Sequence, residues 1–191
     1  MPRLNVIIAS TRPGRSGPAV ADWFTKLAEK HGRFEVRLVD LADVGLPLLD
    51  EPNHPSERNY TKQHTKDWSA IVDAADAFVF VAPEYNYSIN AALKNAIDYL
   101  YHEWQYKPVG IVSYGNTSAG LRAAQMTKQV VTTLKMVPVP ECVAIHYIGQ
   151  HIDADGAFAA TEAMAGSAEG MLDELFSVAE ALEPLRAKAV G

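Results

Sequence analysis

Residues 77–82 read Ala77-Phe78-Val79-Phe80-Val81-Ala82, and Pro83-Glu84-Tyr85-Asn86-Tyr87-Ser88 follows directly. Six consecutive apolar residues that stop at a proline predict a strand buried on both faces, as at the centre of a parallel sheet. In open α/β sheets ligands bind outside the carboxyl ends of the strands. The polar and aromatic loop after this strand is therefore the first candidate for function.

Outward from this strand, short apolar runs alternate with segments of helical periodicity. Strands are predicted over residues 4–9, 34–41, 77–82, 108–114 and 139–148. Helices are predicted from Pro18 to a stop at Gly32, over 65–75, after a cap at Ser88, over 121–134 and over 164–182, with a long surface loop at 45–60. This alternation is typical of βαβ units, so we expect an α/β, doubly wound, three-layer fold with a five-stranded parallel sheet.

Length and charge limit the function classes. With 191 residues the chain is predicted to form one domain, residues 1–191. Its 17 Lys and Arg against 23 Asp and Glu give a net charge of −6, which argues against a nucleic-acid partner. No apolar run approaches the length of a membrane helix, so we expect no membrane span. A phosphorylated ligand would have to be bound by a local group of donors, because the net charge of the chain does not attract it.

Cysteine usage and the N-terminus indicate a compartment. Cys142 is the one cysteine, which excludes an internal disulfide and a multi-cysteine metal site. The six histidines form no ligand-like pair, and we predict no metal site. With no basic-then-apolar leader in the sequence, we expect a cytoplasmic location.

The loop after the first strand has the composition of a phosphate site. It reads Ala9-Ser10-Thr11-Arg12-Pro13-Gly14-Arg15-Ser16-Gly17 and lies directly before a predicted helix. Backbone N–H groups at a helix N-terminus attract an anion, hydroxyls donate to its oxygens, and arginine donates bidentately. An ordinary polar turn with its arginines in solvent is the alternative. Neither a Walker A motif nor a G-x-G-x-x-G fingerprint occurs.

The loops after the third and fourth strands offer flat and close-fitting surfaces. Tyr85 and Tyr87 flank Asn86, which suits a planar heteroaromatic ligand, although exposed tyrosines can equally contact a partner subunit. The loop at residues 113–120 contains glycines that let a ligand approach the backbone closely.

Together these loops resemble the NADPH-dependent FMN reductase family of flavodoxin-like proteins. The resemblance rests on the first loop and on Pro83-Glu84-Tyr85-Asn86-Tyr87-Ser88 followed by Leu93-Lys94-Asn95-Ala96-Ile97-Asp98, the family's P-E-Y-N-x-S and L-K-N-A-I-D pattern. It implies a sheet of order 2-1-3-4-5 and bound FMN as cofactor. Tyr87 stands where the family often has glycine, which implies narrower access to the flavin.

The resemblance also implies a set of cofactor-binding residues. The FMN phosphate would lie on Ser10, Arg12 and Ser16. The isoalloxazine ring would rest on Pro83, Glu84, Tyr85 and Asn86, partly through main-chain donors, with Ser113 and Gly115 on the other side. Arg15 could contact the phosphates of NADPH or lie in solvent.

The activity that the resemblance implies is NAD(P)H-dependent reduction. Hydride would pass from NADPH or NADH to FMN and then to a small-molecule acceptor such as a flavin or quinone, in ping-pong order and without a catalytic side-chain acid or base. A homodimer or dimer of dimers is expected from the family. The alternatives are a flavodoxin-type electron carrier and a redox-sensing FMN-binding protein.

Overall fold

The computed structural model describes residues 1–189 and shows a five-stranded parallel sheet of order β2-β1-β3-β4-β5. The strands are β1 (Arg3–Ile8), β2 (Glu35–Asp40), β3 (Ala77–Pro83), β4 (Pro108–Tyr114) and β5 (Val137–Ile145). The α-helices are α1 (Gly17–His31), α2 (Leu41–Val44), α3 (Gln63–Asp73), α4 (Ala91–Asp98), α5 (Leu121–Thr133) and α6 (Glu162–Ala189). The expected order 2-1-3-4-5 and the flavodoxin-like α/β class are confirmed.

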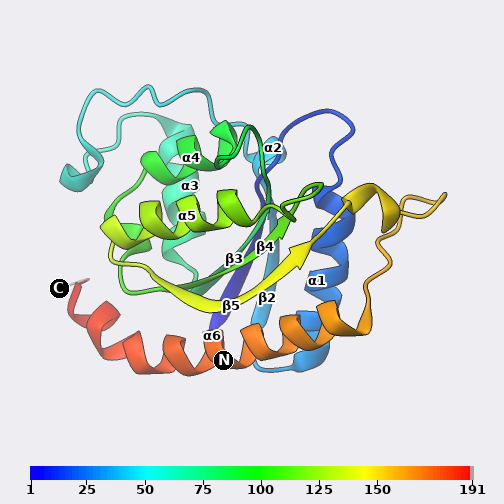
Figure 1. Ribbon diagram of the computed structural model, residues 1–191. Coiled ribbons are helices and arrows are strands. Elements are labelled where there is room, and N and C mark those ends of the chain that lie inside the picture. Colours follow the sequence, from blue (N-terminus) through cyan, green and yellow to red (C-terminus); the bar gives the residue numbers. More distant parts are fainter. Residues whose placement is uncertain (190–191) are drawn as a thin grey trace.

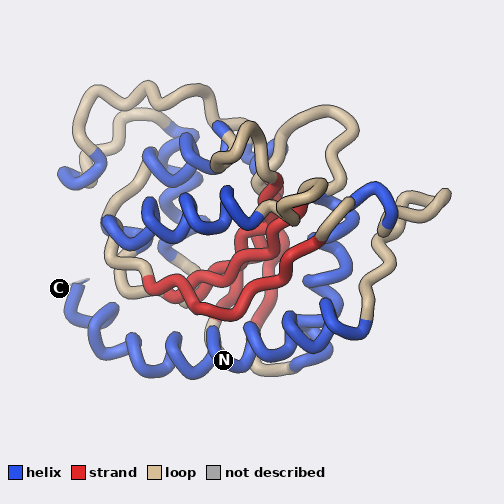
Figure 2. The backbone as a smooth tube through the Cα atoms, viewed as in Figure 1, coloured by secondary structure: helices blue, strands red, loops and turns tan. Residues whose placement is uncertain are grey.

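The sheet lies between two helical layers, as Figures 1 and 2 show. Helices α1 and α6 cover one face and share a core with β1, β3 and β5. Helices α3, α4 and α5 cover the other face and build a second core. This division follows from the right-handed crossovers of parallel strands, which place successive helices according to the strand order.

Strand β3 is buried along its whole length, as its apolar run predicts. Val79 and Val81 face the α1 and α6 layer, whereas Phe78 and Phe80 face the other layer. Both phenylalanine rings contact the buried Trp104, with ring centroids 5.0 and 6.2 Å apart. The central strand therefore supports both cores, and its carboxyl end has a fixed position for a binding loop.

Two element boundaries differ from the sequence prediction at prolines. Strand β5 begins at Val137, two residues before the predicted start, and contains Pro138 and Pro140. It is an edge strand, where a proline without an N–H group can be tolerated. Helix α6 continues through Pro184, where Arg186 in its last turns donates to the Tyr106 carbonyl at 3.2 Å.

The region at 45–60 is a loop, as predicted, with one 3-10 turn at Pro55–Glu57. Its Glu51 carboxylate accepts the main-chain N–H groups of Thr61 and Lys62, both at 2.8 Å, directly before α3. Helix α3 therefore begins at Gln63 instead of residue 65. Among the helices of residues 1–189, none is long and apolar enough to cross a membrane.

Candidate functional site

Three loops meet at the carboxyl ends of β1, β3 and β4 and enclose a cavity of about 220 Å³. The strand order reverses between β1 and β3, so the cavity lies at the switch point where doubly wound sheets bind ligands. Its lining comprises Arg12, Arg15, Ser16, Pro83, Glu84, Tyr85, Tyr114, Gly115, Asn116 and Ile148. Arg12, Ser16, Pro83, Glu84, Tyr85 and Gly115 come from the predicted set.

The other three predicted residues lie behind or beside the cavity. Ser10 is buried and its Oγ lies 2.8 Å from the Tyr85 hydroxyl, so it ties the first loop to the second. Ser113 is buried and donates to the Ala119 carbonyl at 2.9 Å, which holds the third loop. Asn86 is exposed at the tip of the second loop.

The first loop presents an open helix N-terminus to the cavity. Helix α1 begins at Gly17 with Pro18 in its first turn, as the sequence predicts, and ends at His31, where Gly32 follows in the left-handed conformation. Ser16 occupies the N-cap position, yet within the described chain its side chain makes no capping hydrogen bond. The first-turn N–H groups therefore keep their capacity to bind an anion.

Arg15 is held by an ion pair rather than left in solvent. Its Nη2 pairs with Asp40 Oδ2, and the side chain is 18% exposed. Asp40 is itself fixed because its Oδ1 accepts the Ala42 N–H at 2.9 Å at the start of α2. The solvent-exposed alternative for Arg15 is thus wrong: the end of β2 supplies a carboxylate that the local sequence of the loop does not reveal.

Gly17 has no side chain, so a ligand can come close to the backbone at the start of α1. A Cβ atom at this position would lie 3.0 Å from Ile8 Cγ2 and 3.0 Å from the Tyr114 hydroxyl oxygen. A glycine here leaves the first turn of α1 bare beside Arg12 and Arg15. An uncapped helix terminus with two guanidinium groups is a donor set that fits a phosphate monoester such as that of FMN.

The second loop is a tight turn that ends at Ser88. The Ser88 N–H donates to the Tyr85 carbonyl at 3.0 Å, and the Tyr85 N–H donates to the Ser88 carbonyl at 3.2 Å. Because Ser88 takes part in this turn, the prediction that it caps the next helix is wrong. Asn90 occupies the N-cap position of α4, and its Nδ2 donates to the Ala9 carbonyl at 2.7 Å.

Main-chain donors near the expected ring position are partly used within the protein. The Glu84 N–H donates to the Tyr114 carbonyl at 3.1 Å, and the Tyr85 N–H is used in the turn. The Gly115 N–H donates to the Ile145 carbonyl at 3.2 Å. A main-chain donor to a ring resting on residues 83–86 therefore has to come from Asn86, since Pro83 has no N–H group.

The Glu84 side chain binds Arg122 in the first turn of α5. Glu84 Oε1 accepts from Arg122 Nη1 at 2.8 Å, and Oε2 accepts the Arg122 N–H at 3.1 Å. Burial raises the pKa of Glu84, but these hydrogen bonds outweigh burial and hold the pKa below its usual range. The Arg122 guanidinium also stacks over Tyr87, 4.1 Å from the ring centroid. Glu84 is thus an ionised anchor for α5.

Five residues at the cavity or in contact with its loops are not predicted as site residues from the sequence: Tyr114, Asn116 and Ile148, which line it, and Asn90 and Arg122, which bind its loops. Tyr114 and Asn116 fall within the predicted fourth strand and the loop that follows it. Arg122 follows that loop directly, and its position in the first turn of a helix was the available signal. Ile148 lies just after β5, where its N–H donates to the Gly115 carbonyl at 3.0 Å.

The fold and this cavity define the class as a flavodoxin-like protein with a cavity at the switch point of its sheet. The family model for NADPH-dependent FMN reductase matches residues 2–150. The chain therefore belongs to the NADPH-dependent FMN reductase family and is an oxidoreductase of a family that uses NAD(P)H and FMN.

Named relatives agree with this assignment. An NAD(P)H-dependent FMN reductase of Schizosaccharomyces pombe is 42% identical over 146 residues, covering 75% of this chain and 72% of the relative. An FMN-dependent NADPH-azoreductase of Staphylococcus aureus is 27% identical over 154 residues, covering 80% and 81%. In structure, a flavoenzyme NAD(P)H:(acceptor) oxidoreductase of Paracoccus denitrificans matches with a TM-score of 0.74 at 23% identity, over 94% of this chain and 98% of that one, which shows a shared fold.

Proposed function

We propose that residues 1–191 form one FMN-binding domain that transfers hydride from NADPH or NADH, through bound FMN, to a flavin, a quinone or a similar acceptor. The observation that carries this proposal is the switch-point cavity, where the uncapped start of α1 lies beside Arg12 and Arg15. The family membership supports the same cofactor.

The chain's own residues bind and orient in this proposal. The first loop holds the phosphate, and the second and third loops support the ring edge. Bound FMN supplies the hydride acceptor, and the protein needs no side-chain acid or base for that step. The donor and the acceptor substrate reach the ring in turn through the mouth flanked by Tyr87, which gives a ping-pong order.

The test is reconstitution followed by anaerobic reduction. Purified protein mixed with FMN and desalted is expected to keep flavin absorbance, and that absorbance is expected to bleach when NADPH is added without any other protein. Initial rates at several fixed quinone concentrations should give parallel double-reciprocal lines. Retained flavin that NADPH alone does not bleach would instead indicate an electron carrier or a redox sensor.

Arg12 provides a residue-level test of the phosphate position. We expect Arg12→Ala to weaken FMN binding by about tenfold or more, because a charge-assisted hydrogen bond to the phosphate is lost. Its KM for NADPH, measured with FMN in excess, should change far less. Equal FMN retention by the variant would count against this position.

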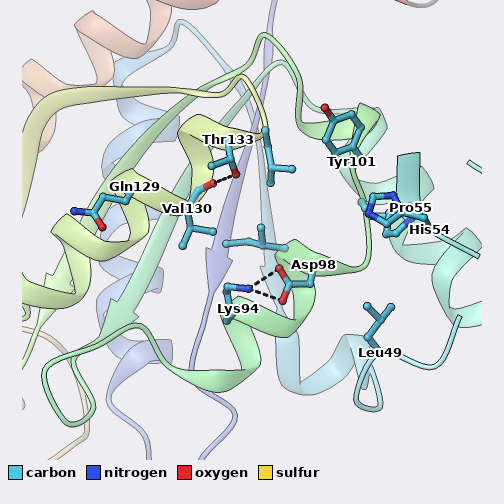
Figure 3. Close-up of a pocket in the computed structure, with 12 residues that line it drawn as sticks. Leu49, His54, Pro55, Lys94, Asp98, Tyr101, Gln129, Val130 and Thr133 are labelled. Atoms are coloured by element: carbon cyan, nitrogen blue, oxygen red, sulfur yellow. Dashed lines mark hydrogen bonds and ion pairs between the residues drawn. The ribbon is translucent and has the colours of Figure 1, made fainter. Parts of the chain in front are cut away.

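We further propose that the protein is a homodimer that associates through a groove between α4 and α5 (Figure 3). The groove has a volume of about 670 Å³, and α4 contributes Lys94 and Asp98 to its lining. These two side chains carry opposite charges 2.6 Å apart. A twofold axis would place Lys94 of one copy opposite Asp98 of the other, so the groove is complementary to itself.

A cytoplasmic location is also proposed, because the partly exposed Cys142 is a free thiol and a reducing compartment would keep it so. Fractionation of the source cells with an antibody against the protein tests this location. Recovery with the membranes or outside the cell would contradict it.

A further inference from the structure

The hydroxyl of Tyr114 has no hydrogen-bond partner within the described part of the chain, although it is buried. Tyr114 ends β4 and is 5% exposed. A buried hydroxyl without a partner is rare in folded proteins and costly, and such a group usually has a role that the protein alone does not show. Among its buried neighbours, Arg15 Nε is unpartnered as well.

The two unpartnered donors belong to residues that line one cavity. Tyr114 lies on the sheet face that α1 covers, and its hydroxyl oxygen lies 3.0 Å from where a Gly17 Cβ would be. Arg15 lies two residues before Gly17, and both Tyr114 and Arg15 line the switch-point cavity. The hydroxyl is therefore beside the first turn of α1, where the N–H groups are also uncapped.

The protonation state of Tyr114 suits a donor. Burial raises the pKa of its hydroxyl above the usual range, and nearby Tyr85 raises it further, whereas Arg15, Arg12 and the polar side chain of Ser10 lower it. The group therefore keeps its proton at neutral pH. A protonated hydroxyl next to two guanidinium groups gains most from an acceptor that carries negative charge.

We propose that Tyr114 is a phosphate-binding residue whose hydroxyl donates to the FMN phosphate at the start of α1, with Arg15 Nε as a second donor. Asp40 is then a positioning residue, because its carboxylate holds the far end of the Arg15 guanidinium. This inference rests on the proposed function, and it adds a strand-borne donor to a site that the sequence assigned to the first loop alone.

The experiment compares two flavins that differ by the phosphate. Dissociation constants for FMN and for riboflavin are measured by flavin fluorescence quenching with wild type, Tyr114→Phe and Tyr101→Phe. Tyr114→Phe is expected to weaken FMN binding by about tenfold or more and to leave riboflavin binding unchanged. The control Tyr101→Phe, in the groove of Figure 3 and outside the switch-point cavity, should change neither constant.

The apoprotein gives a second readout. Because Tyr114→Phe removes a hydroxyl without a partner, its melting temperature without flavin should equal or exceed that of wild type, and the stabilisation by added FMN should shrink. If this variant does not fold, Gly17→Ala tests the same contact, since its Cβ crowds the hydroxyl and should lower the affinity for FMN relative to riboflavin.

Each outcome decides a separate question. Wild-type protein that binds no FMN contradicts the proposed function. Wild type that binds FMN, with Tyr114→Phe binding it equally well, overturns the role of Tyr114. A variant that loses FMN and riboflavin to the same extent also overturns that role, since it points to contact with the ring and not with the phosphate.

Discussion

Among single residues, Tyr87 lies in the second loop, two positions after the cavity-lining Tyr85. Its φ is +68°, a left-handed conformation that favours glycine, and its side chain is 68% exposed. The Arg122 guanidinium covers the ring. The backbone therefore adopts a glycine-like turn that carries a tyrosine, and we expect this side chain to limit access to the neighbouring cavity.

We predict that Tyr87→Gly widens access at little cost in stability. Relief of the left-handed tyrosine is worth about 1 kcal/mol and offsets the lost stacking of Arg122, worth about 0.5–1 kcal/mol. The KM for a bulky quinone should fall severalfold, while the rate with a small quinone stays similar. Steady-state kinetics and urea unfolding measure both effects.

Tyr87→Phe is the matched control, because it keeps the ring and the stacking. It should behave as wild type in both measurements. If Tyr87→Gly left the KM of bulky and small acceptors equally unchanged, Tyr87 would not limit access.

The residue scale also shows how far the sequence predicts the site. Arg12, Ser16 and Tyr85 could be found because phosphate and aromatic ligands demand such side chains at such loops. The use of Glu84 could not be found, because its carboxylate is occupied by Arg122, 38 positions away. Likewise the Glu84 N–H donates to the Tyr114 carbonyl, and this hydrogen bond forms only because the ends of β3 and β4 lie side by side in the sheet.

At the scale of elements, α3 is held at both ends by distant side chains. Glu51 accepts the N–H groups of Thr61 and Lys62 at its start. Lys107 Nζ donates to the carbonyls of Val72 and Asp73 at its end, at 2.9 and 3.0 Å. These contacts explain why the existence of α3 could be predicted from its apolar period, while its limits, Gln63 and Asp73, lie two residues before the predicted ones.

Lys107 gives a pH-dependent prediction. Burial lowers the pKa of Lys107 to about 8, although the nearby carboxylates of Asp73 and Asp76 raise it. In the unfolded chain the pKa has its ordinary value near 10.5. Between these values the unfolded chain binds a proton that the folded chain lacks, so the free energy of unfolding should rise from pH 8 to 10.5 relative to Lys107→Met. Guanidinium unfolding followed by tryptophan fluorescence at pH 7, 8, 9 and 10 measures this difference. A difference that is constant over this range would contradict the burial of the ammonium group.

Glu51 gives a second pH-dependent prediction, in the acid range. Burial raises its pKa, but the hydrogen bonds from Thr61 and Lys62 outweigh burial and lower it to about 2, below the ordinary 4.5. Its ionised form should therefore stabilise the folded state above pH 4.5, and this contribution should be lost as the pH falls from 4.5 towards 2. Glu51→Gln should be less stable than wild type at pH 7, and the two should converge at low pH. Urea midpoints at pH 7, 5, 4 and 3 measure this, and a gap that widens on acidification would contradict it.

At the scale of the whole molecule, net charge and local charge act separately. The chain carries −6, yet Arg12 and Arg15 lie together at one helix N-terminus. A single phosphate responds to those few groups, because charges beyond a Debye length of about 8–10 Å are largely screened. The net negative charge argues against a nucleic-acid partner and is compatible with a phosphorylated cofactor. The sequence alone allows both conclusions, because Arg12 and Arg15 are near neighbours in the chain.

The proposed dimer makes a prediction for the whole molecule that also concerns the α4 and α5 face. Val130 lines the groove of Figure 3 between Lys94 and Thr133. If two copies bury this groove against each other, Val130→Asp places a carboxylate in an apolar contact and should shift the mass in sedimentation from about twice 20.8 kDa to 20.8 kDa. Ala181→Asp adds the same charge at an exposed position of α6, over the opposite face of the sheet, and should leave the mass unchanged.

Charge swaps test whether Lys94 of one copy pairs with Asp98 of the other. Lys94→Asp and Asp98→Lys should each weaken the dimer, because like charges then meet across the twofold axis. The double variant restores opposite charges and should restore the dimer. A dimer that survives Val130→Asp would place the interface elsewhere on the molecule. Monomeric wild type would contradict the proposed self-association but not the proposed flavin site, because the residues that line that cavity belong to one chain.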